Sequence, residues 1–151
     1  MAISPNTTFV ASAVLTAAQQ NAFGFGLMQY GTATSNSTGI TTIATQITLT
    51  AFTALANRNY KITYTEPNLF CIGTSGEATM TIMVGSTTYN SIVQATNNSL
   101  GVSASVTAIT TFSAGSTVVL AKLTNFNSTS LSANRSATKY AICTVEDVGG
   151  A

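Results

Sequence analysis

The acidic side chains are the residues of this sequence whose types and spacing most directly suggest chemistry. Glu66 and Glu77 stand 11 positions apart in different predicted elements, so a glycosidase-type pair of carboxylates is compatible with their separation. Nothing else in the sequence supports such a pair, and the EPN triplet at residues 66–68 predicts a turn after a strand. The simpler interpretation is that Arg58 and Lys61, at a predicted junction between a turn and a strand, form ion pairs with Glu66 or Glu77.

The remaining acidic residues, Glu146 and Asp147, are adjacent near the C-terminal end. Together with backbone carbonyls they have the hard oxygen atoms that bind a cation. Two neighbouring carboxylates are weak support for such a site, and a charged strand end is the ordinary interpretation. The sequence therefore predicts no metal site.

The other common catalytic residue types are scarce. The chain contains no histidine and two cysteines, Cys71 and Cys143, each within an apolar stretch typical of a strand. Buried free thiols that pack as small apolar groups are the first interpretation, and a disulfide between the last strand and the middle of the domain is the alternative. The cysteine spacing matches neither a metal motif nor a redox pair. We therefore predict no catalytic residue and no cofactor, and a protein that packs, adheres or assembles rather than an enzyme.

The composition narrows the choice of partners. Threonine and serine make up more than a quarter of the chain, charged residues only 6%, and the net charge is +1. Such a chain has no basic surface for nucleic acid or anionic lipid. No apolar run approaches the roughly 20 residues of a membrane span. A surface with so few charges either stays soluble through its hydroxyl groups or is covered by copies of itself or by a partner. At 45% hydrophobic residues the chain has enough apolar side chains for a core.

Residues 1–39 are predicted to form an attachment arm. Residues 14–23 contain the one good helical stretch, with Thr16 as its cap, and Gly24 and Gly26 end it. A helix this short is unstable alone, so its apolar side chains need a surface to pack on. The run GTATSNSTG at residues 31–39 predicts a flexible polar linker. The predicted attachment residues of the arm are Phe9, Val14, Leu15, Phe23, Phe25, Leu27 and Met28.

Residues 40–151 have the pattern of an all-β domain. Apolar and polar residues alternate with period two, as in Tyr60, Ile62 and Tyr64 between Asn59, Lys61 and Thr63. Turn signals recur roughly every ten residues and delimit seven or eight short strands, which is typical of an antiparallel β-sandwich of jelly-roll type. Most aromatic residues fall on the inward phase of these strands, so we expect them in the core.

Three segments carry a resemblance to a known class of proteins. The sequence FVASAVLTAAQQN at residues 9–21 resembles the F-v-x-G-x-v-L-T-A-A-x-x-N opening of many tailed-phage virion proteins, tail fibres especially, with Ser12 where those often have glycine. The sequence ANRNYKITY at residues 56–64 is similar to the R-x-Y-x-I-x-Y strand of β-sandwich heads in phage fibre and decoration proteins. The VEDVG sequence at residues 145–149 resembles the end of such heads.

The resemblance implies a non-enzymatic virion structural protein, made in the host cytoplasm and commonly a homotrimer. The first expectation is a capsid decoration (cement) or head-fibre subunit that binds the major capsid protein or a tail protein through its arm. A tail-fibre or receptor-binding head is the alternative, with a host surface glycan as a further partner. A carbohydrate-binding module is an alternative from another class, but such a module typically exposes tryptophan, and the chain has none.

Overall fold

The structure is a computed structural model that describes residues 26–97 and 100–151, all of whose regular elements are β-strands. The prediction of an all-β, antiparallel fold is confirmed, with more strands than the seven or eight expected. The strands are β1 (Gly26–Ala33), β2 (Ser37–Ile40), β3 (Ala44–Thr48), β4 (Phe52–Ala54), β5 (Arg58–Ile72), β6 (Gly76–Val84), β7 (Thr87–Thr96), β8 (Val102–Thr111), β9 (Gly115–Thr117), β10 (Val119–Phe126), β11 (Ser130–Ala133) and β12 (Ala141–Gly150).

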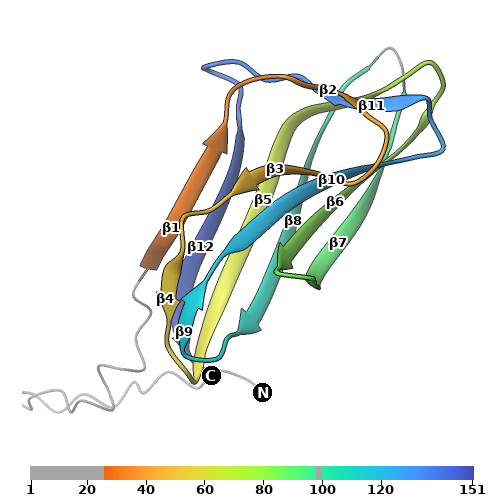
Figure 1. Ribbon diagram of the computed structural model, residues 1–151. Coiled ribbons are helices and arrows are strands. Elements are labelled where there is room, and N and C mark those ends of the chain that lie inside the picture. The colour runs from red at the N-terminus through yellow and green to blue at the C-terminus, as the bar shows by residue number, and fades with distance from the viewer. Residues whose placement is uncertain (1–25, 98–99) are drawn as a thin grey trace, which may run out of the picture.

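The strands form two packed layers (Figure 1). The larger sheet has the order β1-β12-β5-β11-β2, and β8 pairs with the other edge of β5. The smaller sheet has the order β3-β10-β6-β7, and the short strands β4 and β9 pair with each other. Every pairing is antiparallel. The architecture is that of a β-sandwich with its core between the layers.

Strand β5 illustrates why these sequences form strands. Tyr60, Ile62 and Tyr64 have no exposed surface, while the intervening Lys61 and Thr63 are half-buried on the opposite side. Side chains of successive residues point to opposite faces of a strand, so this alternation places one face in the core and the other outside. Each fully buried large apolar side chain stabilises the fold by about 1.5–3 kcal/mol.

Aromatic side chains close one end of the core. Tyr60 packs against Phe52 and Phe112 with ring centroids 5.6 and 5.4 Å apart, and Tyr89 packs on Phe112 at 5.4 Å. The Tyr60 hydroxyl accepts a hydrogen bond from the Leu55 amide at 2.8 Å. The expectation of core aromatics is therefore confirmed for these four rings, although other aromatic residues are exposed, as described below.

In the larger sheet, β1 with β2 and β11 with β12 each form one long strand with an interruption. The two interruptions lie side by side. β11 and β12 both pair with β5 and continue one direction along it, from Leu131 opposite Cys71 to Gly150 opposite Arg58. β1 and β2 pair in turn with β12 and β11. The interruptions, at residues 34–36 and 134–140, lie beside an irregularity in the pairing of β5 with β8 between Glu66 and Leu69.

The turn predicted at residues 66–68 is wrong, because β5 runs through this triplet. Proline lacks an amide hydrogen, and inside a sheet it is tolerated at bulges and edges. Pro67 lies within the irregularity between Glu66 and Leu69, so the strand continues past it.

The boundary predicted at residue 40 also differs from the structure, because the sandwich begins at Gly26. Most of the segment expected to be a flexible linker belongs to β1 and β2, where hydrogen bonds to β12 and β11 order a sequence that is polar but rich in β-branched threonine. Gly31 faces inward beneath the smaller sheet: a Cβ there would lie 2.7 Å from Leu49 Cδ2 and 2.9 Å from Ile47 Cγ2. The predicted helix at residues 14–23 lies outside the described residues.

The described chain enters and leaves the sandwich at one end. Gly26 pairs with Asp147, and the amide of Ala151 donates to the carbonyl of Asn57 at 2.9 Å. The turns after β5, β7 and β10 lie at the opposite end, which we call the loop end (Figure 1).

Candidate functional site

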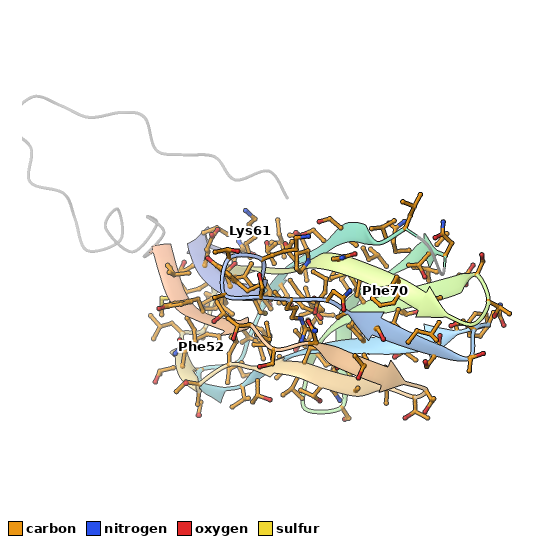
Figure 2. The ribbon with its side chains drawn as sticks, turned by 90° about the horizontal axis from the view of Figure 1, so that it is seen from above. Phe52, Lys61 and Phe70 are labelled. Atoms are coloured by element: carbon orange, nitrogen blue, oxygen red, sulfur yellow. The ribbon has the colours of Figure 1, made fainter. Side chains whose placement is uncertain are left out.

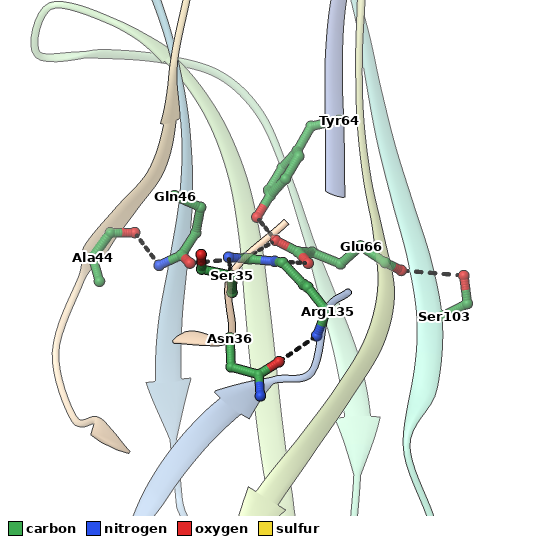
Figure 3. A network of polar contacts seen from close by, with 8 residues as sticks. All are labelled: Ser35, Asn36, Ala44, Gln46, Tyr64, Glu66, Ser103 and Arg135. Carbon is green, nitrogen blue, oxygen red and sulfur yellow. Dashed lines mark hydrogen bonds and ion pairs between the residues drawn. The ribbon is translucent and has the colours of Figure 1, made fainter. Parts of the chain in front are cut away.

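The interrupted level of the larger sheet holds a buried ion pair between Glu66 and Arg135 (Figure 3). Glu66 comes from β5 and has no exposed surface, and Arg135 comes from the loop between β11 and β12 and is also buried. The Arg135 Nε donates to Glu66 Oε2 at 3.0 Å, and its Nη2 donates to Oε1. The guanidinium therefore binds both oxygens of the carboxylate.

Tyr64 completes the coordination of this carboxylate. Its hydroxyl donates to Glu66 Oε1. Burial of the phenol, together with the negative charge of Glu66, raises the pKa of Tyr64 far above its usual value. The phenol therefore keeps its proton at neutral pH and donates a hydrogen bond to Glu66.

Arg135 also connects the interrupted strands with the opposite sheet. Its Nη1 donates to the Ser35 carbonyl at 3.3 Å, and its Nη2 to Gln46 Oε1 in β3 at 2.8 Å. Its backbone amide donates to Asn36 Oδ1 at 2.6 Å. Side chains thus satisfy two backbone groups within the interruptions, the Ser35 carbonyl and the Arg135 amide, which continuous strands would pair in their ladder.

The glycosidase-type pair gains no support from this arrangement. The donors around Glu66 are Tyr64 and Arg135 on its carboxylate and Ser103 on its carbonyl, at 3.1 Å for the last. Glu77 lies on β6 in the smaller sheet, opposite Ala95 and Phe126. With both oxygens engaged by donors in the interior, the Glu66 carboxylate serves to hold the fold.

A second buried ion pair joins β5 to β12 near the end where the chain enters. Arg58 Nε donates to Asp147 Oδ2 at 2.9 Å, and Nη2 donates to Oδ1 at 2.8 Å. The Gly149 amide donates to Asp147 Oδ1 at 2.9 Å. Asp147 is therefore a buried partner of Arg58 rather than a charged strand end or a cation ligand.

The partners predicted for Arg58 and Lys61 are wrong. Arg58 pairs with Asp147, and Lys61 pairs with Glu146 at 3.6 Å on the partly exposed outer side of the same two strands. The prediction placed these cations with the nearest acids in sequence, whereas antiparallel pairing brings β12 beside β5. No group of three or more potential metal-ligating residues occurs in the described part of the chain.

The two cysteines are free and buried, which confirms the first interpretation and contradicts the disulfide. The Thr96 hydroxyl donates to Cys71 Sγ at 2.6 Å. Burial raises the pKa of the Cys143 thiol to about 12. Both thiols therefore belong to the core.

Of the predicted attachment residues, the structure describes Leu27 and Met28, and these two differ in their exposure. Leu27 is 57% exposed, whereas Met28 packs against the core. The difference follows from the alternation of β1, which turns one toward solvent and the other inward. The other five, Phe9, Val14, Leu15, Phe23 and Phe25, lie outside the described residues.

Two exposed surfaces remain as candidates for contact with partners. The first, which we call the outer face, is the side of the larger sheet away from the core, where three rows cross β1, β12, β5 and β8; Lys61 marks this side (Figure 2). The rows are Leu27, Glu146, Lys61 and Ile109; Tyr30, Thr144, Thr63 and Thr107; and Thr32, Ile142, Thr65 and Ser105.

The second surface is the loop end. Here Ile72, Leu100 and Phe126 are exposed, Phe126 by 56%. A hydrogen bond of 3.2 Å from the Cys71 amide to the Asn97 carbonyl places Asn97, which directly follows β7, beside the end of β5. The surrounding side chains include amides and hydroxyls, among them Asn127 and Thr129, and one carboxylate, Glu77, which lies opposite Phe126 on the neighbouring strand.

Sequence reasoning missed the Glu66–Arg135 pair, although two signals point to it. Glu66 continues the inward phase of Tyr60, Ile62 and Tyr64, and Arg135 is the single charged residue between Lys122 and Lys139. A charge on the buried phase of a strand needs a buried partner of opposite sign. Which cation supplies it depends on the fold.

Comparison with known proteins gives no match, either to a protein-family model or to a curated protein. Within residues 26–97 and 100–151, no helix is long and apolar enough to cross a membrane.

Proposed function

We propose that this protein is a non-enzymatic structural protein of a tailed-phage virion, a capsid decoration or head-fibre subunit. It binds the major capsid protein or a tail protein through residues 1–25 and assembles as a homotrimer. The resemblance of residues 9–21, 56–64 and 145–149 to virion proteins supports this function.

The strand order is the structural observation that carries the proposal. Taking the long strands alone, one layer reads β1-β12-β5-β8 and the other β3-β10-β6-β7. We propose that this order is a jelly roll, in which eight strands divide between two four-stranded sheets, an architecture frequent in viral capsid domains. Fold alone does not define function, so the order supports the virion assignment by analogy.

The positions of the ends agree with an anchored subunit. Residues 1–25 precede Gly26, which lies at the end of the sandwich that also holds Ala151. An attachment segment on that side leaves the loop end facing away from the particle.

Deletion of residues 1–25 tests the anchor. The cut leaves β1 intact, so the truncated protein should fold, with the wild-type β-rich circular dichroism and cooperative unfolding. It should be missing from purified particles assembled with it, whereas the full chain is incorporated and is located on the capsid by cryo-electron microscopy. Normal incorporation of the truncated protein would contradict the anchor, and a chain located on neither head nor tail would contradict the function.

A receptor-binding head is the second candidate, favoured by the exposed apolar side chains at the loop end. An aromatic ring beside amides, hydroxyls and the Glu77 carboxylate suits a glycan, since sugars stack on rings and exchange hydrogen bonds with such groups. Phe126→Ser should then reduce adsorption of the phage to its host, while Tyr140→Ser, at a second exposed aromatic residue, should not. Unchanged adsorption with both variants, and no binding on a glycan array, would leave the decoration role.

A further inference from the structure

We infer that the outer face of the larger sheet is the surface through which copies of this chain associate. The inference rests on the self-association included in the proposed function and identifies where it occurs. It is independent of whether the particle site is on the head or the tail.

The outer face exposes large apolar side chains at both margins. On β1, Leu27 and Tyr30 are 57% and 60% exposed, and on β8, Ile109 is 69% exposed. Side chains of this kind gain about 25 cal/mol for each Å² of apolar surface removed from water. These three side chains, two at one margin and one at the other, are without a covering element in the described structure.

The hydroxyl groups in the middle of the outer face can be removed from water at low cost in free energy. The Thr63 and Thr107 hydroxyls lie 3.3 Å apart and hydrogen bond to each other, as do those of Thr65 and Ser105 at 2.9 Å. Burying a hydroxyl costs least when its hydrogen bond is already made. Covering these rows with an apolar neighbour therefore costs less free energy than covering hydroxyls that have no hydrogen-bond partner.

The charges of the face select the partner. Lys61 and Glu146 are its two charged residues, and they pair with each other at 3.6 Å. The face is therefore electrically neutral, and a strongly acidic or basic protein finds no unmatched charge on it. A second copy offers a surface that is equally neutral and equally apolar.

The corresponding face of the smaller sheet is less suited to burial. It carries Lys122 on β10 and Glu77 on β6, and in the described part of the chain neither forms an ion pair. Burying unpaired charges costs far more than burying a pair that is already formed. Self-association through the outer face of the larger sheet therefore costs less free energy of desolvation than self-association through the corresponding face of the smaller sheet.

The two apolar margins also determine the symmetry. When Leu27 and Tyr30 of one copy contact Ile109 of the next, each copy uses two different margins, and such head-to-tail contacts close into a ring when the rotation allows. Three copies arranged in this way place their outer faces around a central axis, in agreement with the proposed homotrimer.

Substitution of Ile109 with lysine, in the full-length protein, tests the face. By light scattering, the wild-type mass should be three times the 15.5 kDa of the chain, and Ile109→Lys should give mostly monomer at the same concentration. Val93→Lys is the matched control, since Val93 is a β-branched residue 60% exposed on the edge strand β7 of the other sheet. The control should remain trimeric, and both variants should unfold at the wild-type temperature.

Cross-linking tests the ring. Cys71 and Cys143 are buried, so in a Leu27→Cys/Ile109→Cys double variant oxidation should produce covalent trimers through the introduced thiols. Either single variant should stay largely uncross-linked. Covalent dimers from Ile109→Cys alone would overturn the ring in favour of a two-fold contact. A trimeric Ile109→Lys, or a monomeric wild type, would overturn the inference, whereas loss of particle incorporation by a trimeric protein would count against the proposed function alone.

Discussion

The two buried ion pairs of this protein perform different tasks. Arg58 and Asp147 belong to the neighbouring strands β5 and β12, which pair on both sides of an irregularity between Asp147 and Gly149, and their side chains hydrogen bond to each other. Glu66 and Arg135 lie where two long strands of the larger sheet are interrupted, and Arg135 also binds Ser35 and Gln46. The first pair links two strands that also pair directly with each other, while the second replaces hydrogen bonds that an interrupted sheet lacks. Four experiments test this difference.

Glu66→Ala should have the largest effect. The change leaves the Arg135 guanidinium buried without its counter-charge and removes the acceptor of the Tyr64 hydroxyl. Removing one partner of a buried pair typically costs about 3–5 kcal/mol, so the midpoint of urea unfolding should fall sharply. Glu77→Ala, at a partly exposed residue of the other sheet, should change the unfolding free energy by less than about 0.5 kcal/mol. Equal effects would show that the network is dispensable.

Asp147→Asn should have a smaller and more local effect. An asparagine retains one oxygen that can accept from Arg58, so the loss should be about 2 kcal/mol, the contribution of a hydrogen bond to a charged group. Hydrogen exchange should increase in β12 and β1 near Gly26, which pairs with Asp147, and remain unchanged at residues 34–36. An increase in exchange at both levels would indicate that the two pairs act as one unit.

Alkaline pH should affect the region of the Glu66 network more than that of the Arg58 pair. Cys143 and Tyr64 lie in that region, and burial raises the pKa of Cys143 from 9.0 to about 12. The folded state therefore holds this proton more tightly than the unfolded state, and its contribution to stability is lost as pH rises from 9.0 toward 12. Cys143→Ala should reduce the slope of unfolding free energy against pH in this window, while Asp147→Asn should keep it.

Lys61→Ala should have the smallest effect. Lys61 pairs with Glu146 on the same two strands as the Arg58–Asp147 pair, but both side chains are partly exposed. Exposed pairs contribute about 0–1 kcal/mol, and added salt screens them. A loss of stability comparable to that of Asp147→Asn would mean that burial does not distinguish the two pairs.

Predictions from the sequence were most accurate where the residues of one segment determine which of its side chains are buried. The alternation of β5 identified Tyr60, Ile62 and Tyr64 as buried, and the apolar neighbours of Cys71 and Cys143 indicated buried thiols. It failed where a distant segment decides. The partners of Arg58 and Lys61 come from β12, which lies beside β5 only after the chain has folded.

The predicted linker at residues 31–39 shows the same limit. Its glycine, serine and threonine residues have the composition of a linker, and nothing local distinguishes them from one. They become strands because β11 and β12 offer free hydrogen-bonding edges, and because Gly31 has no side chain to collide with Ile47 and Leu49.

The sequence by itself determined that this is an all-β protein with buried thiols, because alternation and side-chain type act within a few residues. Only the tertiary structure decided which charges pair, where the sandwich begins and which side chains form the outer face. Those properties depend on strands that are distant in sequence and adjacent in the sheets. The sequence of a single strand does not specify which other strands lie beside it. Glu66 combines both cases: its phase in β5 requires burial, and the fold supplies Arg135.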